Sequence, residues 1–102
     1  MRQLRQFRQG DVLLVECKPP ERTKRTDQNG LRVPGERTGH AHVLPAEVFE
    51  GPGGRRLLYL PEGGTMTHEE HAPLEVPAGW YEPVLQREFT PSARPAARWR
   101  YD

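Results

Sequence analysis

Hydrophobic residues in this chain come in short runs that glycine and proline separate. The clearest run, DVLLVEC at residues 11–17, is rich in Val and Leu and carries apolar residues on both faces. This pattern predicts a strand in the centre of a sheet. Shorter runs predict further strands at residues 31–33, 38–50 (two pieces bent at Pro45), 55–60, 73–76 and 80–89.

The turns between these runs define the fold class. The chain has ten glycines and eleven prolines, and no long window has the spacing of an amphipathic helix. Many short strands joined by turns are typical of an all-β fold, and 102 residues leave room for one domain. We therefore expect a small single-domain β-barrel with its core at residues 10–90, a C-terminal tail at 91–102 and flexible basic termini. Pro83 predicts that the last strand is bent or lies at an edge.

Charge is distributed unevenly along the chain. The formal net charge of +1 excludes a uniformly basic nucleic-acid binder. Residues 62–79, however, carry four glutamates and no Lys or Arg. Negative charge in this acidic segment would help to hold a cation.

The single cysteine and the hydropathy of the chain bear on the cellular compartment that we expect for the protein. The single cysteine, Cys17, cannot form an internal disulfide, so nothing in the sequence requires an oxidising environment. The basic N-terminus is not followed by an apolar run of signal-peptide length, and no stretch is long enough to span a membrane. We expect a cytoplasmic protein without a membrane partner, in which Cys17 acts as a small buried hydrophobic residue.

All four histidines lie in two close pairs, His40 with His42 in GHAH and His68 with His71 in THEEH. Residues two apart in a strand point to the same face, so the first pair can reach one ion. THEEH fits the capping-box pattern of Thr followed by Glu three residues later, which predicts the start of a helical turn. On such a turn residues three apart share a face, so the second pair can chelate as well.

Imidazole groups bind zinc, iron, nickel or copper, and the sequence does not distinguish among these metals. Glu47, Glu69 and Glu70 are the carboxylates available beside the two pairs. If three residues ligate one divalent ion, an open position remains for water or a small-molecule ligand, and Glu69 or Glu70 is the nearest general base. If all four histidines ligate, the site is closed and structural.

The segment GERTGHAHVLPAEVFEGPGG at residues 35–54 resembles the first cupin motif, with a glycine, a His-x-His pair, a glutamate and a second glycine. The resemblance implies that His40, His42 and Glu47 are metal ligands inside a double-stranded β-helix barrel. VPAGWYEP at residues 76–83 is similar to the Pro-x-Gly part of the second cupin motif.

The chain departs from the cupin pattern where the last histidine is expected. Cupins place it just after Pro-x-Gly, and here the sequence reads Trp-Tyr-Glu. Either His68 or His71 takes that position from another strand, or the fold is a different β-barrel with a convergent site. The wider order GDVLL, GHAH, HEEH, PAG and QRE is also similar to small uncharacterised bacterial and phage proteins, which implies no function.

Two interpretations of function stay open. The leading one is a cupin-like β-barrel that binds one divalent transition metal through His40, His42 and one or both of His68 and His71, with Glu47 as a further ligand, and acts as an enzyme or as a structural site. The second is a non-catalytic module that binds a protein or nucleic acid through its polar loop at residues 18–30 and its basic ends. The arginines of these ends are Arg2, Arg5, Arg8, Arg94, Arg98 and Arg100. An exposed edge strand would also allow a homodimer.

Overall fold

A computed structural model describes residues 4–34 and 39–86, and these residues form a single all-β domain, as the sequence predicted. Among them no helix is long and apolar enough to cross a membrane. The predicted tail at 91–102 and the end of the last predicted strand lie outside the described residues. The strands are β1 (Gln6–Gln9), β2 (Val12–Cys17), β3 (Lys24–Arg25), β4 (Gly30–Pro34), β5 (Ala41–Pro45), β6 (Glu47–Glu50), β7 (Arg56–Leu60), β8 (Gly64–His68), β9 (His71–Val76) and β10 (Gly79–Leu85), with a short 3-10 turn at Pro52–Gly54.

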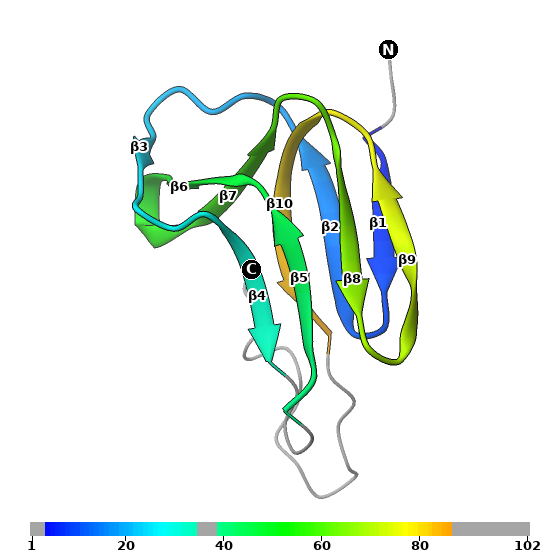
Figure 1. Ribbon diagram of the computed structural model, residues 1–102. Coiled ribbons are helices and arrows are strands. Elements are labelled where there is room, and N and C mark those ends of the chain that lie inside the picture. Colours follow the sequence, from blue (N-terminus) through cyan, green and yellow to red (C-terminus); the bar gives the residue numbers. More distant parts are fainter. Residues whose placement is uncertain (1–3, 35–38, 87–102) are drawn as a thin grey trace, which may run out of the picture.

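The strands form two sheets that lie against each other (Figure 1). One sheet has the order β1-β2-β10-β7-β6-β3 and the other has the order β4-β5-β8-β9. Over the described ranges neither order closes into a barrel. The chain crosses between the sheets at Ala46, which alone separates β5 from β6. On the opposite side β1 and β9, the edge strands of their sheets, lie side by side (Figure 1).

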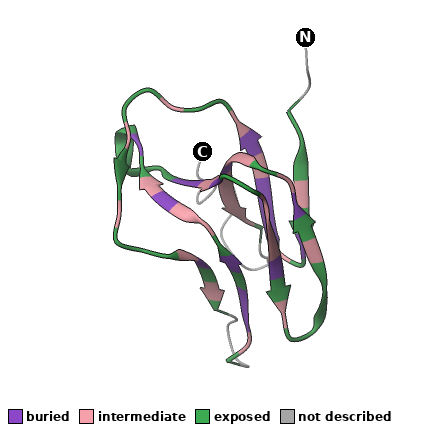
Figure 2. Ribbon diagram, turned by 45° about the horizontal axis from the view of Figure 1, so that its top comes forward, coloured by how far each residue is buried: buried purple, intermediate pink, exposed green. Residues whose placement is uncertain are grey.

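The hydrophobic core lies between the two sheets. Apart from Gly51, the buried residues lie on the strands, whereas the segment from residue 18 to residue 30 is exposed or half-buried throughout (Figure 2). Successive side chains of a strand point to opposite faces, so each strand directs one set of its side chains inward. The buried cluster draws on both sheets and consists of Val12, Leu14, Leu31, Leu44, Val48, Leu58, Leu60, Met66, Val76 and Tyr81.

The hydrophobic pattern did not predict β1, because its sequence QFRQ is mostly polar. Its backbone nevertheless pairs with β2, from Gln6 opposite Val15 to Gln9 opposite Val12. This pairing places β2 between β1 and β10, so the prediction that β2 is central is confirmed.

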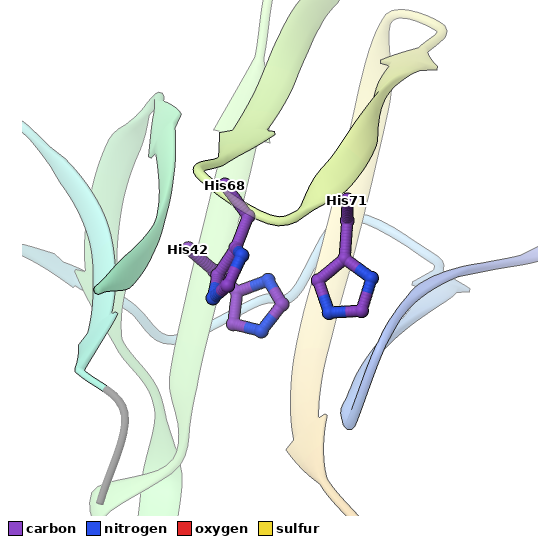
Figure 3. A group of neighbouring side chains, drawn as sticks. All are labelled: His42, His68 and His71. Carbon is purple, nitrogen blue, oxygen red and sulfur yellow. The ribbon is translucent and has the colours of Figure 1, made fainter. Parts of the chain in front are cut away.

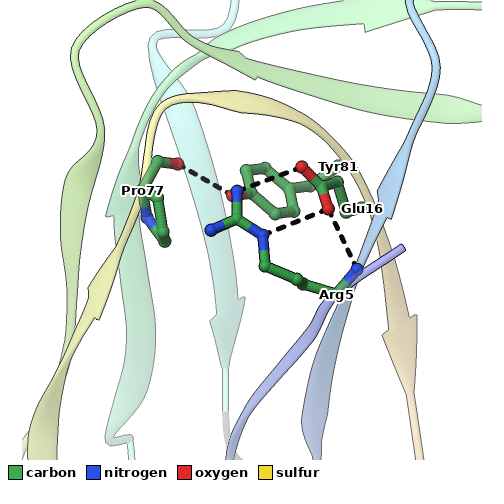
Figure 4. Close-up of polar contacts among 4 residues, drawn as sticks. All are labelled: Arg5, Glu16, Pro77 and Tyr81. Atoms are coloured by element: carbon green, nitrogen blue, oxygen red, sulfur yellow. Dashed lines mark hydrogen bonds and ion pairs between the residues drawn. The ribbon is translucent and has the colours of Figure 1, made fainter. Parts of the chain in front are cut away.

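An ion pair also anchors the N-terminal segment. The carboxylate of Glu16, whose side chain is 5% exposed, accepts hydrogen bonds from the backbone amide and the guanidinium of Arg5 at 2.9, 3.2 and 3.1 Å (Figure 4). Backbone pairing and the Arg5–Glu16 contact thus hold the described part of the basic N-terminal segment against β2, and the flexibility expected of the termini stays a prediction.

The helical turn predicted in THEEH is also wrong, because β8 and β9 form an antiparallel hairpin there. Glu69 and Glu70 make its two-residue turn, and His68 pairs with His71 across it. The register shifts between Met66 and His68, so the strands are irregular just before the turn. Met66 of β8 and Leu74 and Val76 of β9 pack into the core at strand spacing, which outweighs the local capping signal.

The last strand, β10, is interior at its start and free on one side at its end. Residues Gly79–Tyr81 pair with β7, whereas the pairing with β2 continues to Leu85. Pro83 lies past the end of the β7 pairing, opposite Leu14 of β2. Its missing N–H therefore costs no hydrogen bond to β7, and the edge environment predicted for Pro83 applies to this half of the strand.

Candidate metal centre

Three histidines from three neighbouring strands meet at one end of the four-stranded sheet. His42 comes from β5, His68 from the end of β8 and His71 from the start of β9. Figure 3 shows the three rings gathered side by side. The ring centroids of His42 and His68 are 4.3 Å apart, those of His68 and His71 4.6 Å, and those of His42 and His71 5.6 Å. One nitrogen of each ring lies within 4.8 Å of one nitrogen of each of the others.

Strand pairing explains why the rings converge. Residues that flank a two-residue hairpin turn lie directly opposite each other, so His68 and His71 share a face of the sheet. β5 pairs antiparallel with β8 through Val43 and Thr67, and the next pair in this register sets His42 opposite His68 on the same face. The chelating pair predicted at positions 68 and 71 is thus a cross-strand pair and not an i, i+3 pair on a helix.

His42 is the buried member of the group, at 4% exposure. Its Nδ1 lies 2.9 Å from Oε1 of Gln9, and its Nε2 lies 3.1 Å from Oδ1 of Asp11. Burial lowers the pKa of His42, and the neighbouring His68 acts in the same direction, whereas the carboxylate of Asp11 opposes both. The ring is therefore held in the neutral form that binds metals at neutral pH.

Two further residues beside the cluster, Gln9 at the end of β1 and Asp11 just before β2, were not predicted from the sequence and flank Gly10 in the turn between these strands. This turn lies beside the β8–β9 turn at the same end of the molecule (Figure 1). Gly10 has φ +59°, and a Cβ built on it would lie 2.7 Å from Nε2 of His71. A glycine at this position therefore leaves the space that His71 fills. The Gln-Gly-Asp turn before a strong strand was the only local signal, and it did not reveal what the turn would face.

His40 lies just before β5, half-buried, with its ring centroid 5.9 Å from that of His68. Its Nδ1 is 3.1 Å from Oε2 of Glu70. The structure thus brings all four histidines to one region, but His40 is not one of the three whose nitrogens lie within 4.8 Å of one another.

His68 also takes part in the β8–β9 turn. Its Nδ1 accepts a hydrogen bond from the backbone amide of Glu70 at 3.0 Å, so the neutral ring carries its proton on Nε2. If His68 bound an ion through Nδ1, it would exchange this hydrogen bond for the metal. Metal binding would therefore be coupled to the conformation of the turn.

Glu69, predicted together with Glu70 as a general base, fixes the turn to β5. Its Oε1 accepts a hydrogen bond from the backbone amide of Ala41 at 3.1 Å. The backbone amide of Glu69 itself, and after it the bond from Ala41, lower the pKa of this carboxyl. A carboxylate with a lowered pKa is a weaker base, and the role of either glutamate in proton transfer stays a prediction.

Glu47 lies on β6, in the other sheet, and its Oε1 is 3.7 Å from Arg25 of β3. It is not part of the group of histidines, and its role as a ligand stays a prediction.

The basic groups of the second interpretation are only partly described. Arg5 is engaged by Glu16 and Arg25 lies beside Glu47, whereas Arg8 is exposed on β1. The remaining terminal arginines, Arg2, Arg94, Arg98 and Arg100, lie outside the described residues. Binding of a protein or nucleic acid and formation of a homodimer stay predictions.

A separate hollow of about 440 Å³ lies between β2, β4 and β10. Its described lining is mainly apolar, with two arginines and no histidine. A small molecule in this hollow would therefore be bound without the histidine cluster. The lining residues are Val12, Leu31, Arg32, Val33, Pro34, Gly54, Arg56, Pro83, Val84 and Leu85.

Three features of the cluster fit a divalent transition metal. Imidazole is a ligand shared by zinc, iron, nickel and copper. Nitrogen atoms that bind one ion at about 2.1 Å lie about 3.0–3.4 Å apart. The histidine nitrogens, which lie within 4.8 Å of one another, would therefore have to move by about an ångström, which side-chain rotations allow. The absence of a Cβ at Gly10 leaves room for the ring of His71.

Comparison with known proteins gives a family for the chain. A family model described as Domain of unknown function (DUF8820) matches residues 8–86, which include all four histidines, Gln9 and Asp11. No curated protein and no solved structure matches the chain significantly.

Proposed function

We propose a metal-binding function for this chain, which belongs to the family described as Domain of unknown function (DUF8820). In this proposal His42, His68 and His71 bind one divalent transition-metal ion. The observation that carries the proposal is the convergence of these side chains from three strands, with one nitrogen of each within 4.8 Å of the others. Two of the ligands flank the β8–β9 turn and the third lies on the buried part of β5, so the site exists only in the folded chain.

The surroundings of the cluster support an ion over three unrelated histidines. The lowered pKa of His42 keeps a lone pair available at neutral pH. The carboxylate of Glu70 lies beside His40, and Glu69 keeps its negative charge at the same turn. Carboxylates this close to a cation stabilise it electrostatically.

The ligand count favours an accessible site. Three protein ligands leave at least one position for water or a small molecule, and such an ion supplies a Lewis acid that lowers the pKa of bound water. His71 is exposed, so the side of the cluster formed by β9 is open to solvent. His42 would fix the ion from the interior, while His71 would hold it at the surface.

The comparison with cupins belongs to this proposal as well. His42 is common to the ligand set that the cupin motif implies and to the set proposed here. The ligands from β8 and β9 would take the place of the histidine that the second cupin motif lacks in this chain. Glu47 contributes nothing to the set as we propose it, because its carboxylate lies beside Arg25.

Elemental analysis and zinc titration of the purified protein test the proposal. We expect about one metal ion per chain in the parent and a loss of that ion in His71→Ala. His71 is the exposed member of the group, so this variant should keep its fold, which circular dichroism checks.

His40→Ala is the matched control, since it removes a neighbouring imidazole that lies outside the group. We expect it to bind metal with the parental stoichiometry. Loss of the metal in His40→Ala to the same extent as in His71→Ala would instead indicate a closed four-histidine site. A parent protein that takes up no zinc, iron, nickel or copper after metal-supplemented purification would overturn the proposal.

A further inference from the structure

The hydrogen bonds of Gln9 determine which way its side-chain amide group faces. It is 4% exposed, and its Nε2 donates to the backbone carbonyls of Met66 and Ala72, both at 2.9 Å. Both amide hydrogens are thereby used, so Oε1 is the atom that faces Nδ1 of His42 at 2.9 Å. Because a carbonyl oxygen only accepts hydrogen bonds, Nδ1 of His42 must be the donor.

This hydrogen bond determines the other nitrogen of the ring. A neutral imidazole with its proton on Nδ1 carries a lone pair on Nε2. Nε2 of His42 lies 3.1 Å from Oδ1 of Asp11, which is also an acceptor when ionised. Two acceptors at this distance repel each other unless a cation lies between them or beside them.

The cation can be a proton or a metal ion, and the neighbours favour the metal ion. Two ligand atoms that share an ion at about 2.1 Å lie about 3.0 Å apart at a right angle and about 3.4 Å apart at the tetrahedral angle. The observed 3.1 Å falls between these values. Asp11 lies outside the group whose ligand atoms are all within 4.8 Å of one another, so its carboxylate would have to rotate toward His68 and His71 to share their ion. A proton would bridge His42 and Asp11 alone, whereas a metal ion at this position would also bind nitrogens of His68 and His71, which lie within 4.8 Å of the ring of His42.

From this geometry we infer that Asp11 is a fourth ligand to the metal, and that Gln9 is a positioning residue which fixes the tautomer of His42. The inference rests on the proposed function. Its consequence is that the ion joins the two sheets, since the histidines belong to the four-stranded sheet and Asp11 follows β1 in the six-stranded one. A ligand set of three imidazoles and one carboxylate suits a divalent ion such as zinc, iron or manganese better than copper(I).

Cobalt(II) titration with absorption spectroscopy tests the role of Asp11, because the visible spectrum reports both affinity and ligand set. We expect Asp11→Asn to lower the cobalt affinity by at least about 100-fold, beyond what loss of an outer partner costs, and to change the spectrum of the residual complex. Glu75→Gln is the matched control, since it removes a carboxylate of β9 that accepts from Thr65, and it should leave both unchanged.

The role of Gln9 has a separate readout. In the metal-free parent, ¹⁵N NMR should show His42 with its proton on Nδ1, and in Gln9→Leu the two tautomers should mix. Gln9→Leu should lower the cobalt affinity about 10- to 100-fold.

The outcomes separate this inference from the proposed function. A parent that binds no cobalt overturns both. A parent that binds cobalt while Asp11→Asn keeps the same affinity and spectrum overturns the role of Asp11 and leaves the three-histidine site intact. A His42 ring with its proton on Nε2 in the parent overturns the role of Gln9.

Discussion

Substituting Gly10 by alanine should damage the metal site much more than it damages the fold. Gly10 has φ +59°, a conformation that costs an alanine about 1–2 kcal/mol. The new Cβ would also lie 2.7 Å from Nε2 of His71, 3.1 Å from Cε1 of His71 and 3.2 Å from Cε1 of His42. The obstructing atoms of His71 are the end of an exposed side chain, so the folded protein can relieve the clash by rotating that ring.

The same movement is costly for metal binding. Ordinary van der Waals contact begins at 3.4 Å, so the ring of His71 has to retreat by about 0.7 Å, and metal–ligand distances are defined to about 0.2 Å. We expect zinc affinity to fall at least about tenfold, or about 1.4 kcal/mol of binding free energy. Isothermal titration calorimetry measures the affinity, and urea unfolding of the metal-free protein measures the stability.

Gly53→Ala is the matched control. Gly53 has φ +74°, and no atom lies within 4 Å of a Cβ built on it. It should lose a similar free energy of unfolding to Gly10→Ala, about 1–2 kcal/mol, while its zinc affinity stays parental. If Gly10→Ala bound zinc as tightly as Gly53→Ala does, the space that Gly10 leaves beside the histidines would not matter for zinc binding.

Three further predictions concern the fold and its ionisable groups. Tyr81→Phe removes a hydroxyl that is fully buried and donates to the carbonyl of Pro77 at 2.8 Å (Figure 4), so it should lower the free energy of unfolding by about 1 kcal/mol. Tyr59→Phe, at a half-buried tyrosine on the same sheet, should have a smaller effect in the same urea titration. Burial raises the pKa of the Cys17 thiol, so alkylation by iodoacetamide should reach its half-maximal rate at a higher pH in the folded protein than in the urea-unfolded chain, and coincident pH profiles would contradict this. The pKa of His42 is lowered in the folded state, so below about pH 6.5 the unfolded chain binds a proton first and the metal-free protein should lose stability as the pH falls, with a shallower loss in His42→Gln.

The fold class could be predicted because it depends on local pattern. Short apolar runs with glycine and proline between them exclude long helices and favour many strands, and β2 was predicted as a central strand because both of its faces are apolar. β1 was not predicted, because it lacks such an apolar pattern. Its residues are mostly polar, and it is a strand because the backbone of β2 offers a partner and Glu16 binds Arg5.

The candidate site could be predicted in part. The two pairs of histidines are visible in the sequence, and their convergence was expected. His68 and His71 were predicted on a helical turn, and they lie on a β-hairpin. The Thr-x-x-Glu pattern favours a helical turn locally, whereas the strand period of β8 and β9 requires a hairpin. His40 and His42 stay near each other along the chain, yet only His42 joins the group with its nitrogen within 4.8 Å of the others.

The amino-acid sequence by itself determined the all-β class, the central place of β2 and the concentration of imidazole groups in two segments, because each depends on residues close together in the chain. The tertiary structure decided which of these groups meet, and it added Gln9, Gly10 and Asp11 to them. No sequence feature near these three residues predicts that they contact histidines. The turn between β1 and β2 reaches the cluster only when the edges of the two sheets come together. Contacts across that junction depend on how the whole core packs, and a pattern read along the chain does not contain them.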